Sequence, residues 1–163
     1  ELDGTITDRV KAIGAAFEEA GMHCIVSDNI MGVIWDKLLV NVATGAVCGI
    51  THLPYGDMYQ EDKLVATAVA AVQEGMDVAA KAGVKLTYSD PMDVLELARA
   101  GLPYDFKPSI LQSLEKHRPT EVGVINGAVV AQGAKHGVAT PVNETLVACV
   151  TGIERYIREY INK

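Results

Sequence analysis

The sequence predicts a mainly α-helical protein with a short α/β segment at its N-terminus. Of its 163 residues, 49% are hydrophobic and only 6% are aromatic, and alanine and valine are frequent, which favours closely packed helices. Most of the chain divides into stretches with apolar residues at helical spacing, bounded by capping residues, prolines or glycines. Stretches that favour strands are few, and those we identify lie near the front. A chain of this length can bury a substantial core as one compact unit.

Residues 1–27 are expected to form a strand end, a helix and a second strand. Apolar residues from Val10 to Phe17 keep helical spacing, Gly21 is a suitable stop, and "HCIVS" at 23–27 is β-prone. Two short strands alone do not make a stable sheet. We therefore interpret this segment as a remnant of a larger sheet-containing domain.

Residues 28–163 are expected to form a separate helical domain. A cap, a proline or a glycine marks most of the helix boundaries. The first expected helix runs from Asp28 through Trp35 and Val40 toward Gly45, and "THLPYGDMYQ" at 51–60 breaks it with Pro54 and Gly56. The other expected helices run from about Asp62 to Ala82, from Ser89 to Gly101, onward from Pro108, from Thr120 to Gly137 with Gly123, Gly127, Ala131 and Gly133 inside, and from Thr140 and Pro141 to the end.

Charge, cysteine and histidine patterns argue against several functions. The net charge is −7 and the 14 lysines and arginines are scattered, so nucleic acid is not expected as a partner. Three cysteines without a CxxC pair indicate free thiols and a cytoplasmic location. We find no secretory leader and expect no membrane span. The four histidines lack HxxxH or HExxH spacing, and GxSxG, GxGxxG and GxxxxGK[ST] motifs are absent, so zinc, serine-hydrolase and phosphate-loop sites are not expected.

The stretch "IWDKLLVN" places a lysine and an asparagine four residues apart in an apolar helix, as Lys37 and Asn41. Residues at this spacing share a helix face. A protonated lysine can donate a hydrogen bond, and then its proton, to a carbonyl oxygen that receives a hydride, and Asn41 could hold the same substrate. On spacing alone, Lys37 could equally extend its ammonium into solvent, and Asn41 could be a satisfied half-buried amide.

Two further polar residues could contribute to a site. Ser109 follows Pro108 in the first turn of its helix, where free backbone N–H groups favour an anion such as a 2-oxo acid carboxylate. Glu121 could accept hydrogen bonds from the sugar hydroxyls of a nucleotide. Each also has a purely local interpretation, as a first-turn serine and as an acidic residue favoured near a helix start beside Thr120.

Taken together, these stretches resemble the ketopantoate reductase (2-dehydropantoate 2-reductase) family, specifically its C-terminal helical domain. The resemblance covers nearly the whole chain. It is carried by "ELDG", "IWDKLLVN", "LPYGDMY", "KPSILQSLEKHRPTEVGVING" and "AKHGVATPVNETL", whose order and spacing agree with the family.

The resemblance implies a two-domain oxidoreductase in which a Rossmann domain binds NADPH and this helical domain, similar to that of 6-phosphogluconate dehydrogenase relatives, closes the active site. Residues 1–27 would then be the last βαβ element of the Rossmann domain. Lys37 would be the general acid, Asn41 and Ser109 would contact the 2-oxo acid substrate, and Glu121 would contact the nucleotide or active site. The expected reaction is reduction of 2-dehydropantoate to pantoate in pantothenate synthesis. A fragment without the Rossmann domain should be inactive.

The chain also departs from the family pattern. Gly45 and Ala46 stand where relatives often carry a second asparagine and a proline, and Gly123 stands where an acidic residue is common. These departures leave a different 2-oxo acid open as the substrate. A non-catalytic helical module for dimerisation or binding is the alternative from another class, and a homodimer is compatible with either interpretation.

Overall fold

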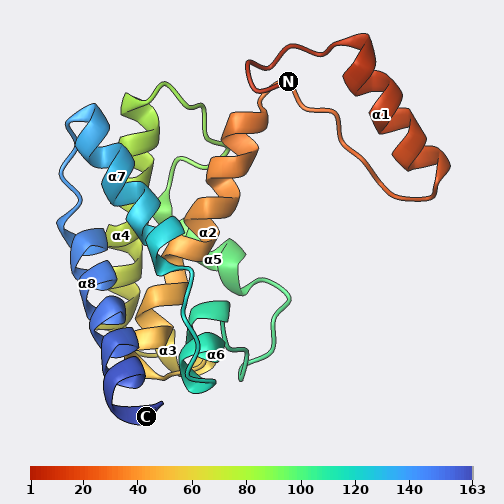
Figure 1. Ribbon diagram of the computed structural model, residues 1–163. Helices are drawn as coiled ribbons and strands as arrows, with labels where there is room; N and C mark the ends of the chain where they lie inside the picture. The colour runs from red at the N-terminus through yellow and green to blue at the C-terminus, as the bar shows by residue number, and fades with distance from the viewer. Residues whose placement is uncertain (163) are drawn as a thin grey trace.

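Helices dominate the computed structural model, which describes residues 1–162 (Figure 1). The α-helices are α1 (Asp8–Glu19), α2 (Ile30–Thr51), α3 (Tyr55–Met58), α4 (Asp62–Lys81), α5 (Pro91–Arg99), α6 (Ser109–Glu115), α7 (Asn126–His136) and α8 (Pro141–Tyr156). A 3-10 turn, η1 (Val122–Val124), precedes α7, and a π-helical turn, η2 (Ile157–Ile161), extends α8. The predicted mainly α-helical fold is confirmed.

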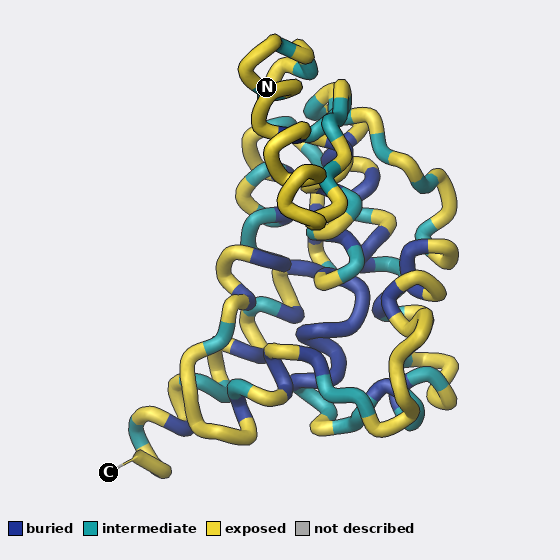
Figure 2. The backbone as a smooth tube through the Cα atoms, turned by 90° about the vertical axis from the view of Figure 1, so that its right-hand side faces the viewer, coloured by how far each residue is buried: buried dark blue, intermediate teal, exposed yellow. Residues whose placement is uncertain are grey.

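The central element of the body is α2, which packs against α4, α5, α6 and α8. Dark blue segments in Figure 2 mark the buried backbone along the middle of the molecule. Small residues allow the close packing: a Cβ atom added to Gly49 would lie 2.7 Å from Ile110 of α6, and one added to Gly75 of α4 would lie 2.5 Å from Leu39. The buried residues of α2 are Gly32, Trp35, Leu39, Val42, Ala43, Thr44, Gly45, Ala46, Val47, Cys48 and Gly49.

The predicted break of this helix within 51–60 is confirmed. The helix α2 passes through Gly45, continues to Thr51 and ends with His52 in a left-handed conformation. Gly45 and Gly49 are buried against α6, so the packing that they allow outweighs their low helix propensity. At the other end the cap is Asn29 rather than Asp28, since the Asn29 side chain accepts a hydrogen bond from the Gly32 amide.

By length and apolar composition alone, α2 would also suit a membrane span. However, 56% of its most apolar stretch is buried inside this structure. Polar residues Asp36, Lys37 and Asn41 occur on its outer side. We therefore describe α2 as the core helix of the body.

The remaining boundaries follow the predicted signals with two adjustments. Pro91 opens α5, but Asp90 rather than Ser89 is its cap. The helix predicted over Thr120 to Gly137 is divided, because Ile125 leaves helical geometry between η1 and α7. Gly137 ends α7 in a left-handed conformation as expected.

Residues 1–28 form an arm that leaves the helical body and returns to it (Figure 1). The predicted helix is present as α1, whose buried residue is Gly14, close to Val26 of the returning segment. The predicted strands are not formed, and residues 1–162 contain no strand at all. A strand needs a neighbour for its backbone hydrogen bonds, and the arm provides none.

Candidate active site

A cavity of about 290 Å³ lies where α2, the α5–α6 connection and the start of α6 meet. Two of the four predicted site residues, Asn41 of α2 and Ser109 of α6, line it. They are 68 positions apart in the sequence, and the packing of α6 against α2 brings them together. The lining residues are Val40, Asn41, Thr44, Gly45, Tyr55, Ala98, Leu102, Phe106, Pro108, Ser109, Ile110 and Ile125.

Glu121 joins this pair through a hydrogen bond. The Ser109 hydroxyl donates to Oε2 of Glu121 across 3.4 Å, and both residues are exposed. Asn41 and Ser109 therefore line the cavity, and Glu121 contacts one of its lining residues. The carboxylate beside Ser109 and the seven-residue length of α6 both weaken the predicted preference of this helix start for an anion.

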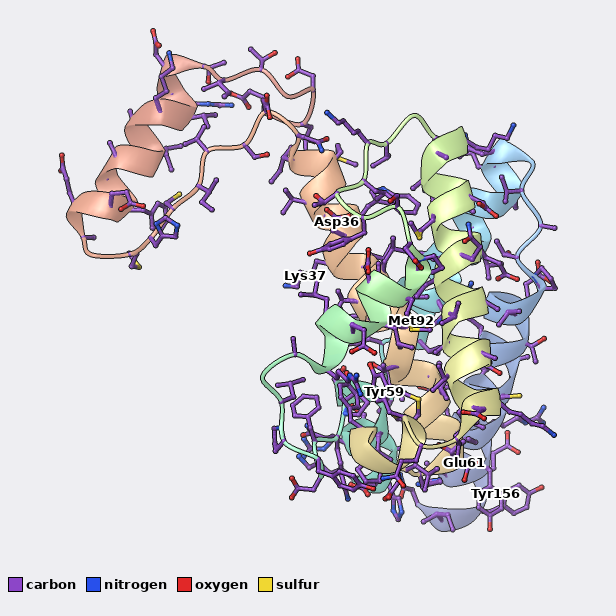
Figure 3. The ribbon with its side chains drawn as sticks, turned by 180° about the vertical axis from the view of Figure 1, so that it is seen from behind. Asp36, Lys37, Tyr59, Glu61, Met92 and Tyr156 are labelled. Atoms are coloured by element: carbon purple, nitrogen blue, oxygen red, sulfur yellow. The ribbon has the colours of Figure 1, made fainter. Side chains whose placement is uncertain are left out.

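Lys37 lies on the same helix as Asn41 but does not line the cavity. Figure 3 shows its side chain pointing outward from α2, on the side of the molecule where the arm also lies. The residue is exposed and its ammonium forms no hydrogen bond or ion pair with the described residues. Lys37 therefore presents a free cation one helical turn from the rim of the cavity.

Deeper in the cavity, Thr44 of α2 and Tyr55 of α3 share a hydrogen bond between hydroxyls 2.7 Å apart. Burial raises the pKa of the Tyr55 phenol, and the Thr44 hydrogen bond opposes that rise. The Tyr55 ring packs edge-on against Phe106, with ring centres 5.0 Å apart. The sequence analysis missed this pair. Thr44 lies three positions after Asn41, on the same helix face, which is the signal that could have identified it.

The connection between α5 and α6 forms one wall of the cavity and is held to α3 by backbone and side-chain bonds. The Tyr55 amide donates to the Phe106 carbonyl at 3.0 Å, and the Gly56 amide donates to the Tyr104 carbonyl at 2.7 Å. The Tyr104 hydroxyl donates to Asp57 at 2.7 Å, and this bond raises the pKa of the Tyr104 phenol. The wall that carries Phe106 is thus fixed by its contacts with α3.

The described residues contain no group of three histidines, cysteines or acidic residues that could hold a metal ion. The three cysteines are free, as predicted, and Cys48 is buried in the core of the body. Burial raises the pKa of the Cys48 thiol to about 12. This thiol is therefore a packing group and not a nucleophile.

Comparison with known proteins identifies the family. Residues 29–154 match the family described as ketopantoate reductase PanE/ApbA, C terminal. A 2-dehydropantoate 2-reductase of Archaeoglobus fulgidus is 30% identical over 154 residues, which are 94% of this chain and 51% of that protein. The chain therefore belongs to the ketopantoate reductase family and corresponds to its C-terminal domain.

Solved structures agree with this family assignment. A PanE/ApbA family ketopantoate reductase from Ralstonia eutropha JMP134 has a TM-score of 0.83 and 30% identity, over 94% of this chain and 51% of its own. D-mandelate dehydrogenase with NADH and anilino(oxo)acetate has a TM-score of 0.81 and 27% identity, over 94% of this chain and 66% of its own. The chain thus spans about half the length of the curated relatives that it matches.

Proposed function

We propose that this chain is the substrate-binding half of an NADPH-dependent reductase that converts 2-dehydropantoate to pantoate. Family membership supports the reaction class, because the relatives are named 2-dehydropantoate 2-reductases. The observation that carries the proposal is that Asn41 and Ser109, from two different helices, line one cavity, while Lys37 presents a free ammonium one turn away.

In this proposal Lys37 is the general acid. Its Cβ atom and that of Asn41 lie about 5–6 Å apart on one face of α2, as expected for residues four apart. When a hydride reaches C2 of the substrate, negative charge develops on the keto oxygen. The ammonium stabilises that charge and then transfers a proton to it. Asn41 and Ser109 hold the polar end of the substrate by hydrogen bonds.

A nicotinamide cofactor, NADPH in our proposal, supplies the hydride when it is bound. This chain has no GxGxxG loop that could hold the pyrophosphate, so we assign the cofactor mainly to protein outside it. Glu121 is the residue here that we propose faces the nucleotide. An exposed carboxylate accepts hydrogen bonds from sugar hydroxyls, whereas it would repel a phosphate.

We further propose that residues 1–27 belong to the nucleotide-binding domain and residues 28–163 to the substrate domain. Large apolar side chains of the arm support this division, because they are exposed here. Ile13 is 52% exposed, Phe17 44% and Ile25 77%. Full burial of an exposed side chain of this kind stabilises a protein by about 1.5–3 kcal/mol, and covering the exposed part of each of these would contribute up to that amount. A partner domain on this side would also cover Lys37.

A different 2-oxo acid is the second candidate substrate. Gly45 lines the cavity without a side chain. The likeness to D-mandelate dehydrogenase, whose structure holds anilino(oxo)acetate, supports a family cavity that can be adapted to other 2-oxo acids. A panel of 2-oxo acids assayed with NADPH and NADH would rank the two candidates.

The decisive experiment is steady-state kinetics on the full-length protein that carries this chain. We expect Lys37→Ala to lower kcat by roughly 10²-fold or more, the scale for loss of a general acid. Lys63→Ala is the matched control, since Lys63 is also an exposed lysine, lies on α4 and does not line the cavity, and its loss should leave kcat unchanged. Near-normal turnover by Lys37→Ala would remove Lys37 from the mechanism. Absence of any 2-oxo acid reduction by the wild type would favour a non-catalytic module.

A further inference from the structure

The position of the Glu121 carboxylate depends on how the backbone around it is held. The side chain is exposed, and among the described residues it makes a single hydrogen bond, the 3.4 Å contact from the Ser109 hydroxyl. Such a long bond restrains a side chain only weakly. The direction in which the carboxylate points is therefore set mainly by the anchoring of its own segment.

The segment that carries Glu121 is folded on itself. The Val124 and Ile125 amides both donate to the Glu121 carbonyl, at 3.0 Å each. The Val122 amide donates to the Thr120 hydroxyl at 3.2 Å. These bonds make the stretch from Thr120 to Ile125 one unit, and Ile125 at its end lines the cavity. The contacts that hold the two ends of this unit therefore also place Glu121.

Helix α8 holds both ends of the unit. At the first end, the Thr120 amide donates to Oε1 of Glu154 at 2.6 Å, a short bond to a charged acceptor. Directly after the other end, the Asn126 side-chain amide donates to Oδ1 of Asn143 at 3.0 Å. Glu154 lies 11 residues after Asn143, so the two project from nearly the same side of α8, about 16 Å apart along its axis. One side of α8 thus supports the Glu121 segment.

The anchor at Glu154 can be removed without opening the core. Asn126 and Asn143 are fully buried, and Asn143 also donates to the Ala71 carbonyl at 2.9 Å, so truncation there would destabilise the body. Glu154 is only partly buried, and its carboxylate makes no other hydrogen bond with the described residues. Loss of the Glu154 carboxylate therefore releases one end of the unit and leaves the other end fixed.

We infer that Glu154 is a positioning residue, which holds the Thr120 amide and thereby keeps the Glu121 carboxylate where it meets the sugar hydroxyls of the nucleotide. The inference rests on the proposed function, in which Glu121 faces the nucleotide. Glu154 does not line the cavity, and it contacts neither substrate nor cofactor in this assignment. It acts through the Glu121 segment alone.

The Kd of NADPH for the full-length protein that carries this chain tests the inference. Glu121→Ala should raise this Kd by about 10-fold or more, the scale for one hydrogen bond to a charged group. Glu154→Ala should raise it by about 3- to 10-fold, because the Glu121 carboxylate is present but no longer held. Glu154→Gln should stay within about twofold of the wild type, since its amide oxygen still accepts from the Thr120 amide. In Glu154→Ala, kcat at saturating NADPH should change little.

A double variant separates positioning from a general effect on the structure. When Glu121 is already alanine, adding Glu154→Ala should raise the Kd by less than about twofold more, because no carboxylate remains to be placed. A purely structural loss would add its full effect in both backgrounds. Urea denaturation of each variant gives the folded fraction by which the titrations are corrected.

Glu159→Ala is the matched control. Glu159 is also a partly buried acidic residue, five positions beyond Glu154, and it pairs with Arg155 at 3.0 Å rather than with the Glu121 segment. Its loss should leave the Kd of NADPH unchanged.

Three results would overturn the inference alone. They are wild-type NADPH binding by Glu154→Ala, full additivity of Glu154→Ala with Glu121→Ala, and a loss in Glu154→Gln as large as that in Glu154→Ala. An unchanged Kd in Glu121→Ala would instead remove Glu121 from nucleotide binding, and would overturn that part of the proposed function together with the inference.

Discussion

The helical body and the arm have similar patterns of apolar residues, but these residues are buried in the body and exposed in the arm. In the body, the apolar face of α2 is enclosed by α4, α5, α6 and α8, and Leu39 is fully buried. In the arm, α1 has the same helical spacing of apolar residues, yet Ile13 and Phe17 are exposed. Figure 2 shows this contrast as a dark blue core and an arm that is mostly yellow and teal. An amphipathic pattern therefore predicts a helix, whereas burial depends on a partner.

The largest expected effect is that of truncating a side chain at the centre of the body. Leu39→Ala should lower the free energy of unfolding by about 2–5 kcal/mol, because it leaves a cavity between α2 and Gly75 of α4. Urea denaturation of the 163-residue chain measures this loss. Leu2→Ala is the matched control in the arm, since Leu2 is 73% exposed, and it should change stability by less than about 0.5 kcal/mol. Similar losses for the two variants would contradict the contrast between the regions.

A second change tests a polar contact that is specific to the body. Glu74 of α4 accepts hydrogen bonds from the Val142 and Asn143 amides at 2.8 and 3.0 Å, and so caps the first turn of α8. Glu74→Ala should cost about 1–3 kcal/mol in the same denaturation experiment, because partly buried donors lose their acceptor.

The control for Glu74 is Asp77→Ala on the same helix. Asp77 is exposed and accepts one hydrogen bond, from Gln73 on its own helix. Its loss should be within about 0.5 kcal/mol. If both variants lose the same amount, the interhelical cap contributes nothing beyond an ordinary surface contact.

The smallest expected effect is that of a substitution in the arm, measured both in the 163-residue chain and in the full-length protein. Phe17→Ser should alter the stability of the 163-residue chain by less than about 0.5 kcal/mol, since Phe17 is already exposed. In the full-length protein the same change should cost about 1.5–3 kcal/mol if a partner domain buries the ring. Glu19→Ser, at an exposed polar position of α1, should be neutral in both proteins. A silent Phe17→Ser in the full-length protein would mean that the arm stays uncovered.

Much of the body could be predicted from local signals. Pro91, Gly137 and the Thr140–Pro141 pair act through backbone geometry that the residue itself imposes, and all three mark real boundaries. The helix α2 passes through Gly45, whose effect depends on Ile110, which is distant in the sequence. Prolines and caps therefore act within a few residues of themselves, whereas the effect of a packed glycine can be predicted only when its neighbours in the fold are known.

Local sequence patterns were also insufficient to predict the whole candidate site. Asn41 and Ser109 were predicted, and the structure brings them to one cavity. Their common location could not be derived from spacing within either helix. The Thr44–Tyr55 pair was missed because a threonine in an apolar helix and a tyrosine after a proline are ordinary core residues until tertiary packing joins them.

The arm begins and ends at one point. Gly4, with a φ of +84°, lies so close to the Asp28 carbonyl that a side chain there would collide with it. Residues 4 and 28 therefore lie in contact, and the segment between them forms a loop that closes at the start of α2. Exchanging that loop for another of matching end-to-end distance would leave the first turn of α2 in place. This crossing is therefore a suitable junction for joining other N-terminal segments to the helical body.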